Sequence, residues 1–218
     1  MKAIRESVGK GCKNNLDDLA TIVELLRERR QDPFYQKKMM AINIPDTKDS
    51  DLLGKLTQAI IEFQKSIQEL KAPDGVVAPN GSTIYFLGGV RKDGKQIIVD
   101  LEDQDLYAYE GGKLAFKFHA TSGDESHPTA TRPQLYHVFR KHKKYVSKTY
   151  NARMDYAMFF TYDGKAIHQS NAVTLTSYLK VLGLNFFGSH GCVRLAEEDA
   201  AKLFEWTPMN TPVFIDMA

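Results

Sequence analysis

The 218-residue chain has a net charge of +2, with 43% hydrophobic and 26% charged residues, as expected of a globular protein. This near-neutral balance gives no support for nucleic-acid binding, and we find no apolar run long enough to span a bilayer. The chain has two cysteines, Cys12 and Cys192. Because two distant cysteines do not make a disulfide framework, we expect free thiols, with a Cys12–Cys192 pair as the alternative.

The first third of the sequence has the apolar spacing of helices. The stretch "NNLDDLATIVELLRERR" predicts a helix capped by Asn15, with acidic residues in its first turn and arginines in its last. A polar loop, "RRQDPFYQKK", is expected to follow. The apolar positions of this helix are Leu16, Leu19, Val23 and Leu26.

A second helix is predicted in "LLGKLTQAIIEFQKSIQELK", where Asp49, Ser50 or Asp51 can provide the N-cap. The turn-rich stretch "APDGVVAPNGSTIYFL" then leads to a short third element. The apolar positions of the second helix are Leu53, Leu56, Ile60, Phe63, Ile67 and Leu70.

From about residue 90 the sequence changes to short runs of β-branched and aromatic residues, which predict strands. Gly111-Gly112 and Asp163-Gly164 are hairpin signals. A late helix in "AEEDAAKLFEW" precedes a closing strand in "TPVFIDM". The other strand-like runs are "KQIIVDL", "DLYAYEGGKLAFKFHAT", "QLYHVF" and "YAMFFTYDGKAIHQS". This spacing is typical of a sandwich or barrel.

The stretch "GSHGCVRL" places chemically active groups close together in the sequence. Cys192 can become a nucleophile if a nearby imidazole, from His168 or His190, takes the thiol proton. Gly191 would let backbone N–H groups approach a developing oxyanion. The planar fork of Arg194 suits a substrate carboxylate.

Each of these residues also has an ordinary structural explanation. A lone buried cysteine more often serves packing than catalysis, and a lone histidine or arginine is more often a surface or satisfied residue. A strand-end histidine followed by Ser-His-Gly-Cys-apolar-Arg is, as a set, much harder to explain in this way. We therefore interpret the set as a catalytic motif.

The motif "SHGCVRL", with upstream "IHQSN", resembles the signature of the L,D-transpeptidase catalytic domain, the YkuD-like family. The resemblance extends over roughly residues 95–217. It implies an enzyme with a β-sandwich that acts on peptidoglycan stem peptides without a cofactor or metal. By the same resemblance Cys192 is the nucleophile and His168 the general base, while the carbonyl of Gln169 orients the imidazole. The remaining site residues implied for catalysis or substrate binding are Ser189, His190, Gly191 and Arg194.

The spacer between His168 and Ser189 is longer than is usual in the family, and its "AVTLTSYLKVLG" is expected to form a short helix beside the site. The N-terminal "SVGKGCKNNLDDLATIVELL", "AIIEFQKSI" and "PDGVVAPNGSTIYFL" resemble a peptidoglycan-binding module, with a generic helical cap as the alternative. The predicted α+β organisation is a helical module over 1–88 followed by a mostly β catalytic sandwich over 89–218.

The expected reaction forms a thioacyl-enzyme that is resolved by cross-linking or by exchange with a D-amino acid. The alternatives are an L,D-carboxypeptidase, a secreted effector that attacks another cell's wall, and a non-catalytic wall-binding protein. The expected partners are stem peptides and the sacculus, with no nucleic acid; the sequence does not fix the oligomeric state. The N-terminus lacks a signal-peptide core, so a periplasmic or wall-associated site of action implies another export route, such as a secretion apparatus with an immunity partner, or a signal removed from this chain.

The segment from His127 to Met154 contains seven Arg or Lys residues and no Asp or Glu. It can attract acidic wall fragments, and a solvated basic hairpin is the equally good alternative.

Overall fold

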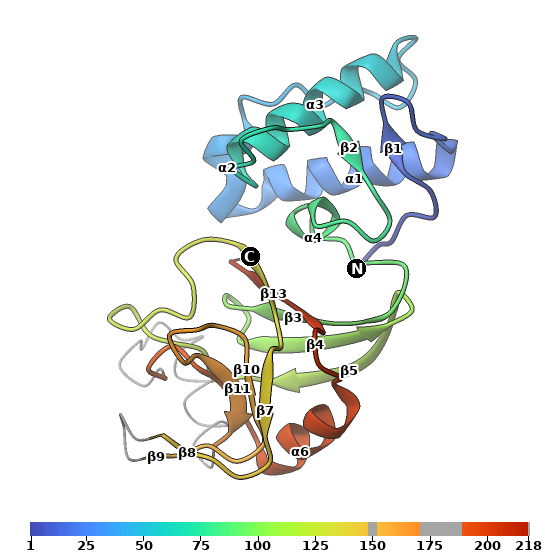
Figure 1. The fold of residues 1–218 in the computed structure, drawn as a ribbon. Coiled ribbons are helices and arrows are strands. Elements are labelled where there is room, and N and C mark those ends of the chain that lie inside the picture. Colours follow the sequence, from blue (N-terminus) through green and yellow to red (C-terminus); the bar gives the residue numbers. More distant parts are fainter. Residues whose placement is uncertain (148–151, 171–188, 218) are drawn as a thin grey trace. The chain divides into compact units, whose positions relative to one another are not determined.

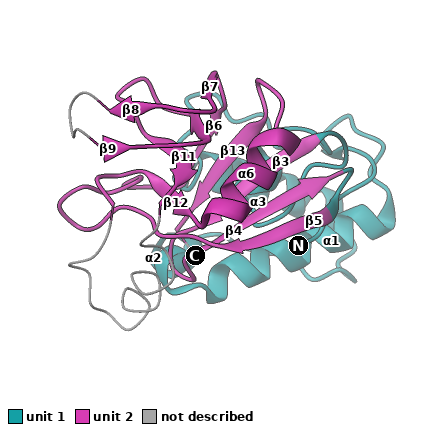
Figure 2. Cartoon of the chain, turned by 90° about the horizontal axis from the view of Figure 1, so that it is seen from below, with its two compact units in different colours: residues 1–94, 111–113, 218 teal, residues 95–110, 114–217 magenta. Residues whose placement is uncertain are grey.

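The computed structural model describes residues 1–147, 152–170 and 189–217, which form two compact units (Figure 2). The N-terminal unit contains Met1–Gly94 with Gly111–Lys113, and the second unit contains Lys95–Glu110 with Leu114–Met217. We call the second the sandwich unit because two sheets pack face to face within it. The fold class is therefore mixed helix and sheet, as predicted.

The N-terminal unit is built mainly from three helices (Figure 1). Helix α1 begins after Asn15, whose side chain accepts a hydrogen bond from the amide of Asp17, and α3 begins after Asp51, whose carboxylate accepts one from Gly54. Both caps are among the predicted ones. The bounds are α1 Leu16–Gln31, α2 Pro33–Met39 and α3 Leu52–Ser66.

Three sequence predictions for this unit are wrong. The expected polar loop contains α2, in which Asp32 is the N-cap and Pro33 occupies the first turn. This arrangement is favourable because proline lacks the N–H that a first turn leaves unpaired. Helix α3 ends at Ser66, earlier than its apolar spacing indicated. Leu16 and Leu53, both predicted at apolar positions, lie outside the apolar faces of their helices, with 78% and 40% of their surfaces exposed.

Two short strands and one helical turn complete the N-terminal unit. Strands β1 and β2 pair antiparallel through Val8 with Val77 and Gly9 with Val76. The bounds are β1 Val8–Gly9, β2 Val76–Val77 and α4 Thr83–Phe86. The helices bury a shared apolar core whose largest members include Ile22, Leu25, Leu26, Tyr35, Met39, Leu56, Ile60, Phe63 and Tyr85.

The first sheet of the sandwich unit has five strands in the order β5-β4-β3-β13-β6. Strand β13 lies inside the sheet, parallel to β3 and antiparallel to β6. Its five residues are all buried, as expected of an interior strand. The bounds are β3 Lys95–Asp100, β4 Asp105–Glu110, β5 Lys113–His119, β6 Gln134–His137 and β13 Pro212–Asp216.

The second sheet has four strands in the order β12-β11-β10-β7. Strands β11 and β12 are parallel, and the other pairs are antiparallel. A separate two-stranded ribbon, β8 with β9, lies between β7 and β10 in the sequence. The bounds are β7 Arg140–His142, β8 Val146–Ser147, β9 Ala152–Arg153, β10 Ala157–Phe159, β11 Ala166–Gln169 and β12 Val193–Leu195.

Alternate residues of both sheets form one apolar core with the helix α6, Glu197–Trp206. Because side chains alternate along a strand, the second sheet turns Met158, Ile167, Val193 and Leu195 toward this core. The residues between them, including Phe159, Ala166 and Cys192, form a smaller cluster on the opposite face. That opposite face therefore carries the cysteine.

No helix in the described part of the chain is long and apolar enough to cross a membrane.

Lys141 connects the edge of the second sheet to the end of α6. Its ammonium donates hydrogen bonds to the carbonyls of Phe204 and Thr207 and lies over the ring of Phe204. A cation at a helix C-terminus satisfies carbonyls that lack intrahelical partners. The contact therefore holds α6 against the sheet that carries the cysteine.

We expect Lys141→Met to lower the free energy of unfolding by about 1–3 kcal/mol, since it removes charge-assisted hydrogen bonds. Chemical denaturation measures the change. The control is Lys143→Met, which removes an exposed pair with Glu205 and should change stability by less than about 1 kcal/mol. Equal effects of the two substitutions would contradict the role of Lys141.

Candidate active site

Cys192 follows a tight turn that is fixed from both sides. The amide of Ser189 donates to the carbonyl of Ser122 at 2.9 Å, and the buried hydroxyl of Ser189 donates to the carbonyl of Cys192. Gly191 has φ of +87°, a conformation that favours glycine, and a Cβ there would lie 3.0 Å from Cε of Lys165. Ser189 and Gly191 therefore set the position of the thiol through the backbone.

Parallel pairing of β11 with β12 brings the predicted base next to the cysteine. His168 pairs with Arg194 and Ile167 with Val193. Ile167 and Val193 face the core, so His168 and Arg194 face the other way, with Cys192 two residues before Arg194. Strand spacing then places the Cα atoms of Cys192 and His168 about 8 Å apart, a separation that their side chains can bridge.

The imidazole of His168 is held in one tautomer. Its Nδ1 lies 2.7 Å from the carbonyl oxygen of Gln169. Because a carbonyl only accepts, Nδ1 carries the hydrogen and Nε2 is left as the basic nitrogen. Burial of the ring, which is 6% exposed, lowers the pKa of His168 to about 4; the Gln169 carbonyl opposes this shift and Arg194 adds to it. The imidazole is therefore neutral near pH 7.

The thiol of Cys192 is half-buried, and burial raises its pKa. The amide of Ala166 and the charges of Arg194 and Lys165 oppose this rise, whereas Asp163 adds to it. The resting site is therefore a neutral thiol beside a neutral imidazole, and the positive surroundings favour the thiolate once the proton leaves.

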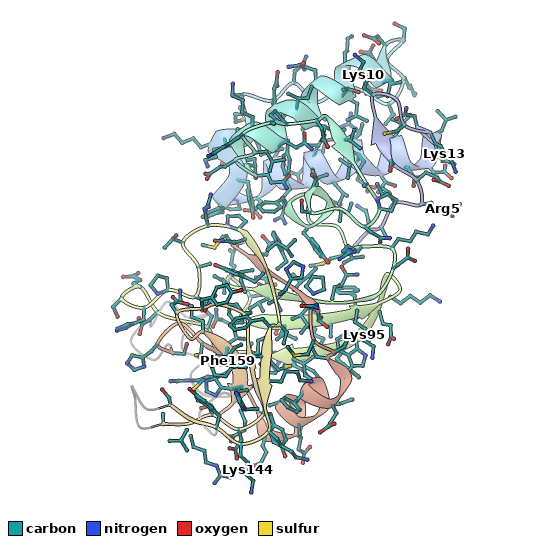
Figure 3. All side chains as sticks on the ribbon, viewed as in Figure 1. Arg5, Lys10, Lys13, Lys95, Lys144 and Phe159 are labelled. Carbon is teal, nitrogen blue, oxygen red and sulfur yellow. The ribbon has the colours of Figure 1, made fainter. Side chains whose placement is uncertain are left out.

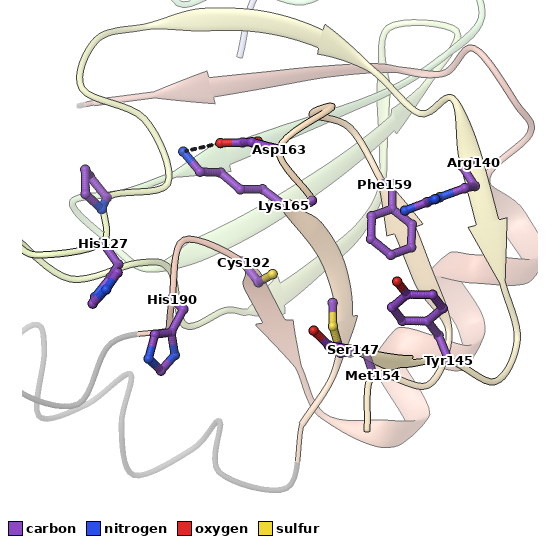
Figure 4. A pocket seen from close by; sticks show the side chains of 12 residues that line it. His127, Arg140, Tyr145, Ser147, Met154, Phe159, Asp163, Lys165, His190 and Cys192 are labelled. Carbon is purple, nitrogen blue, oxygen red and sulfur yellow. Dashed lines mark ion pairs between the residues drawn. The ribbon is translucent and has the colours of Figure 1, made fainter. Parts of the chain in front are cut away.

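A cavity of about 330 Å³ opens over the cysteine on this face of the second sheet (Figure 4). His127 and His190 lie on one side of Cys192, with ring centroids 4.8 Å apart. Arg140 and Phe159 lie on the other side. The lining residues are His127, Pro128, Arg140, Tyr145, Ser147, Met154, Phe159, Asp163, Gly164, Lys165, His190 and Cys192.

Of the residues singled out from the sequence, Cys192 and His190 line this cavity. His168 and half-buried Arg194 lie beside it on the same face of the sheet, outside the lining. Gln169, Ser189 and Gly191 act through the backbone contacts given above. The spacer predicted to form a helix lies outside the described residues.

The sequence analysis did not single out Lys165, Asp163 or the aromatic side chains of the lining. Lys165 donates to the carbonyl of Thr129 at 3.2 Å and lies 3.7 Å from Asp163. The hairpin signal Asp163-Gly164 marked the position of this loop, but only strand pairing shows that the loop reaches the cysteine.

These features define a β-sandwich protein with a thiol–imidazole site on the outer face of one sheet. The sequence model of one family, YkuD, the L,D-transpeptidase catalytic domain, matches residues 94–215. That match covers more than half of the chain, so the chain belongs to the YkuD family of L,D-transpeptidase catalytic domains. The resemblance noted in the sequence is thus confirmed for the catalytic part. The likeness of the N-terminal unit to a peptidoglycan-binding module stays a prediction.

Similar solved structures include L,D-transpeptidases from three bacteria. The Stackebrandtia nassauensis protein is 22% identical, with a TM-score of 0.49 over 99% of this chain and 96% of that one. The Enterococcus faecium protein, a mutant, is 24% identical, with a TM-score of 0.48 over 65% of this chain and 55% of that one. The Mycobacterium smegmatis protein is 17% identical, with a TM-score of 0.47 over 56% of this chain and 59% of that one.

The chain thus spans less than two thirds of the M. smegmatis and E. faecium structures. The family assignment depends on the sequence match over residues 94–215. No curated protein matches the chain.

Burial of His168 makes stability depend on pH. The folded pKa is about 4 and the unfolded value is about 6.5, so the unfolded chain binds the proton first as pH falls. Stability should therefore decline between pH 6.5 and pH 4, by up to about 3 kcal/mol from this group. His168→Gln, compared with wild type by denaturation across this range, should remove that part of the decline. Parallel pH profiles for the two proteins would show that the imidazole is not held neutral by burial.

Proposed function

We propose that the chain is a cysteine-dependent L,D-transpeptidase that acts on peptidoglycan stem peptides through a thioacyl-enzyme. The observation that carries the proposal is the thiol of Cys192 in a cavity, on the same sheet face as the fixed imidazole of His168. Membership of the YkuD family supports the choice of reaction.

In the first step the sulfur of Cys192 attacks the carbonyl carbon that follows the L-centre of a tetrapeptide stem. Nε2 of His168 takes the thiol proton, so that a carbon–sulfur bond forms as the carbonyl becomes an oxyanion. The negative charge that develops beside the imidazole raises its basicity during this transfer. The same proton then passes to the leaving nitrogen, the amide bond breaks, and D-alanine is released.

The polar groups around the thiol suit the charges that develop in this step. Backbone N–H groups of the turn at Gly191, which has a positive φ, can stabilise the oxyanion. Arg194, whose guanidinium lies on the same sheet face, can bind a substrate carboxylate. His190 lines the cavity and can contact the substrate.

An amine acceptor resolves the thioester. The amine attacks the acyl carbon, the carbon–sulfur bond breaks, and the thiol recovers its proton. The side-chain amine of another stem gives a cross-link, a free D-amino acid gives exchange, and water gives an L,D-carboxypeptidase. All three outcomes share the Cys192 thioester, so the ratio of products from a defined muropeptide distinguishes them.

We extend the proposal to the N-terminal unit, which would bind the sacculus and hold the sandwich unit at its substrate. Family membership supports an extracytoplasmic site of action at the cell wall.

Cys192→Ala should abolish acylation by a carbapenem and by stem peptides while the chain stays folded, because only the half-buried sulfur is removed. Intact-protein mass spectrometry detects the adduct. Cys12→Ser is the matched control, since Cys12 lies in the other unit, and it should be acylated like wild type. An adduct on the Cys192→Ala protein would rule out the proposed nucleophile.

His168→Ala should lower the rate of acylation by roughly 10²–10⁴-fold, the range for loss of a positioned general base. His190→Ala should reduce it less, since His190 lines the cavity and is assigned a substrate contact in this scheme, not proton transfer. Single-turnover acylation, followed by stopped flow, measures both. A larger loss for His190→Ala would reverse the assignment of the base.

A further inference from the structure

We propose that Arg140 forms a specificity subsite that binds a carboxylate of the donor stem peptide, on the residues that precede the attacked carbonyl. Arg140 lies on β7, the edge strand opposite β12 in the second sheet. The identity of the peptide rests on the proposed function, whereas the anion site itself rests on the contacts of Arg140.

Strand register places Arg140 in one row with the cysteine. Phe159 pairs with Arg140 on one side and with Ala166 on the other. Because Ile167 pairs with Val193, Cys192 follows in line with Ala166. Residues in one row share a face, so the side chains of Arg140, Phe159 and Cys192 all point away from the core.

The row also gives the distance between the two ends of the site. Three strand spacings of about 4.8 Å put the Cα atoms of Arg140 and Cys192 about 14 Å apart. An extended peptide rises about 3.3 Å per residue, so a bound carboxylate would lie a few residues from the attacked carbonyl. The leaving D-alanine is a single residue and its carboxylate is too close. We therefore place the bound carboxylate on the preceding part of the stem.

The guanidinium of Arg140 lies against two aromatic rings. Its Cζ lies 3.9 Å from the ring centroid of Phe159 and 5.9 Å from that of Tyr145. The two rings support each other edge to face at 5.1 Å. A cation–π contact does not use the hydrogen-bond pairing that a carboxylate offers, so the fork of N–H donors remains suited to a carboxylate.

The charge balance of the cavity leaves Arg140 without a counterion. The one carboxylate of the described lining, Asp163, lies 3.7 Å from the ammonium of Lys165. Within the described residues the guanidinium of Arg140 makes no ion pair and no hydrogen bond. Lys144, in the basic segment from His127 to Met154, is exposed and points away from the second sheet (Figure 3). Phe159, whose ring contacts Arg140, is buried in that sheet. Arg140 is thus a fixed cation that faces the cavity.

The test measures binding in the absence of turnover. Two tetrapeptide stems are compared: one has free carboxylates, and in the other only the carboxylates that precede the attacked residue are amidated. The C-terminal carboxylate, which is one that Arg194 could bind, stays the same in both. Binding to the full chain carrying Cys192→Ala is followed by NMR titration or calorimetry, with and without a change at Arg140.

Arg140→Gln should weaken binding of the acidic stem about tenfold or more, as expected for loss of a charge-assisted contact. Binding of the amidated stem should change less than about twofold. Arg140→Lys should recover part of the affinity, since it keeps the charge but loses the fork. Arg132→Gln, which removes an exposed arginine outside the lining, should have no effect.

Equal losses for the two stems, or no loss for either, would overturn the subsite. Arg140→Met keeps an unbranched apolar side chain over Phe159. It therefore separates a packing role from a charge role if Arg140→Gln unfolds. If the acidic stem acylates wild type but substitutions at Arg140 affect binding of the two stems equally, the proposed function stands and the subsite is rejected. If Arg140→Gln weakens binding of the acidic stem alone but no stem acylates wild type, the anion site stands and the proposed function is rejected.

Discussion

Parallel pairing of β11 with β12 is the constraint on which the site depends. This register sets His168 opposite Arg194 and turns both away from the core, together with Cys192. A shift of β11 by one residue would bury the imidazole in the sandwich and expose Ile167. The same apolar packing that stabilises the fold therefore also determines which groups lie on the face that carries the cysteine.

The site combines a resting state of low charge with an electropositive cavity. Burial favours the neutral forms of both the thiol and the imidazole. In the proposed mechanism the reactive ion pair therefore forms only as a substrate is attacked. Lys165 and Arg194 favour the thiolate at that point. A thiol that stays protonated until then is protected from oxidation, because oxidants react with the thiolate.

Local signals in the sequence were enough to predict the caps of α1 and α3, the hairpins and the Cys-His motif. The helix α2 was missed although Asp32-Pro33 is a good start signal. Only two of its seven residues, Tyr35 and Met39, are buried, so no apolar pattern marked it. Arg140 and Lys165 could not be placed on the cavity from the sequence. Their positions depend on the pairing of strands that are distant in the chain, and no local pattern encodes that pairing.

The interior position of β13 has a consequence for how the molecule folds. Val213 pairs with Ile97 on one side and Tyr136 on the other, so the edges of β3 and β6 stay unpaired until residues 212–216 arrive. During synthesis the sandwich unit must wait for this segment before its larger sheet can close. Such long-range pairing slows folding and leaves strand edges exposed to aggregation in the meantime.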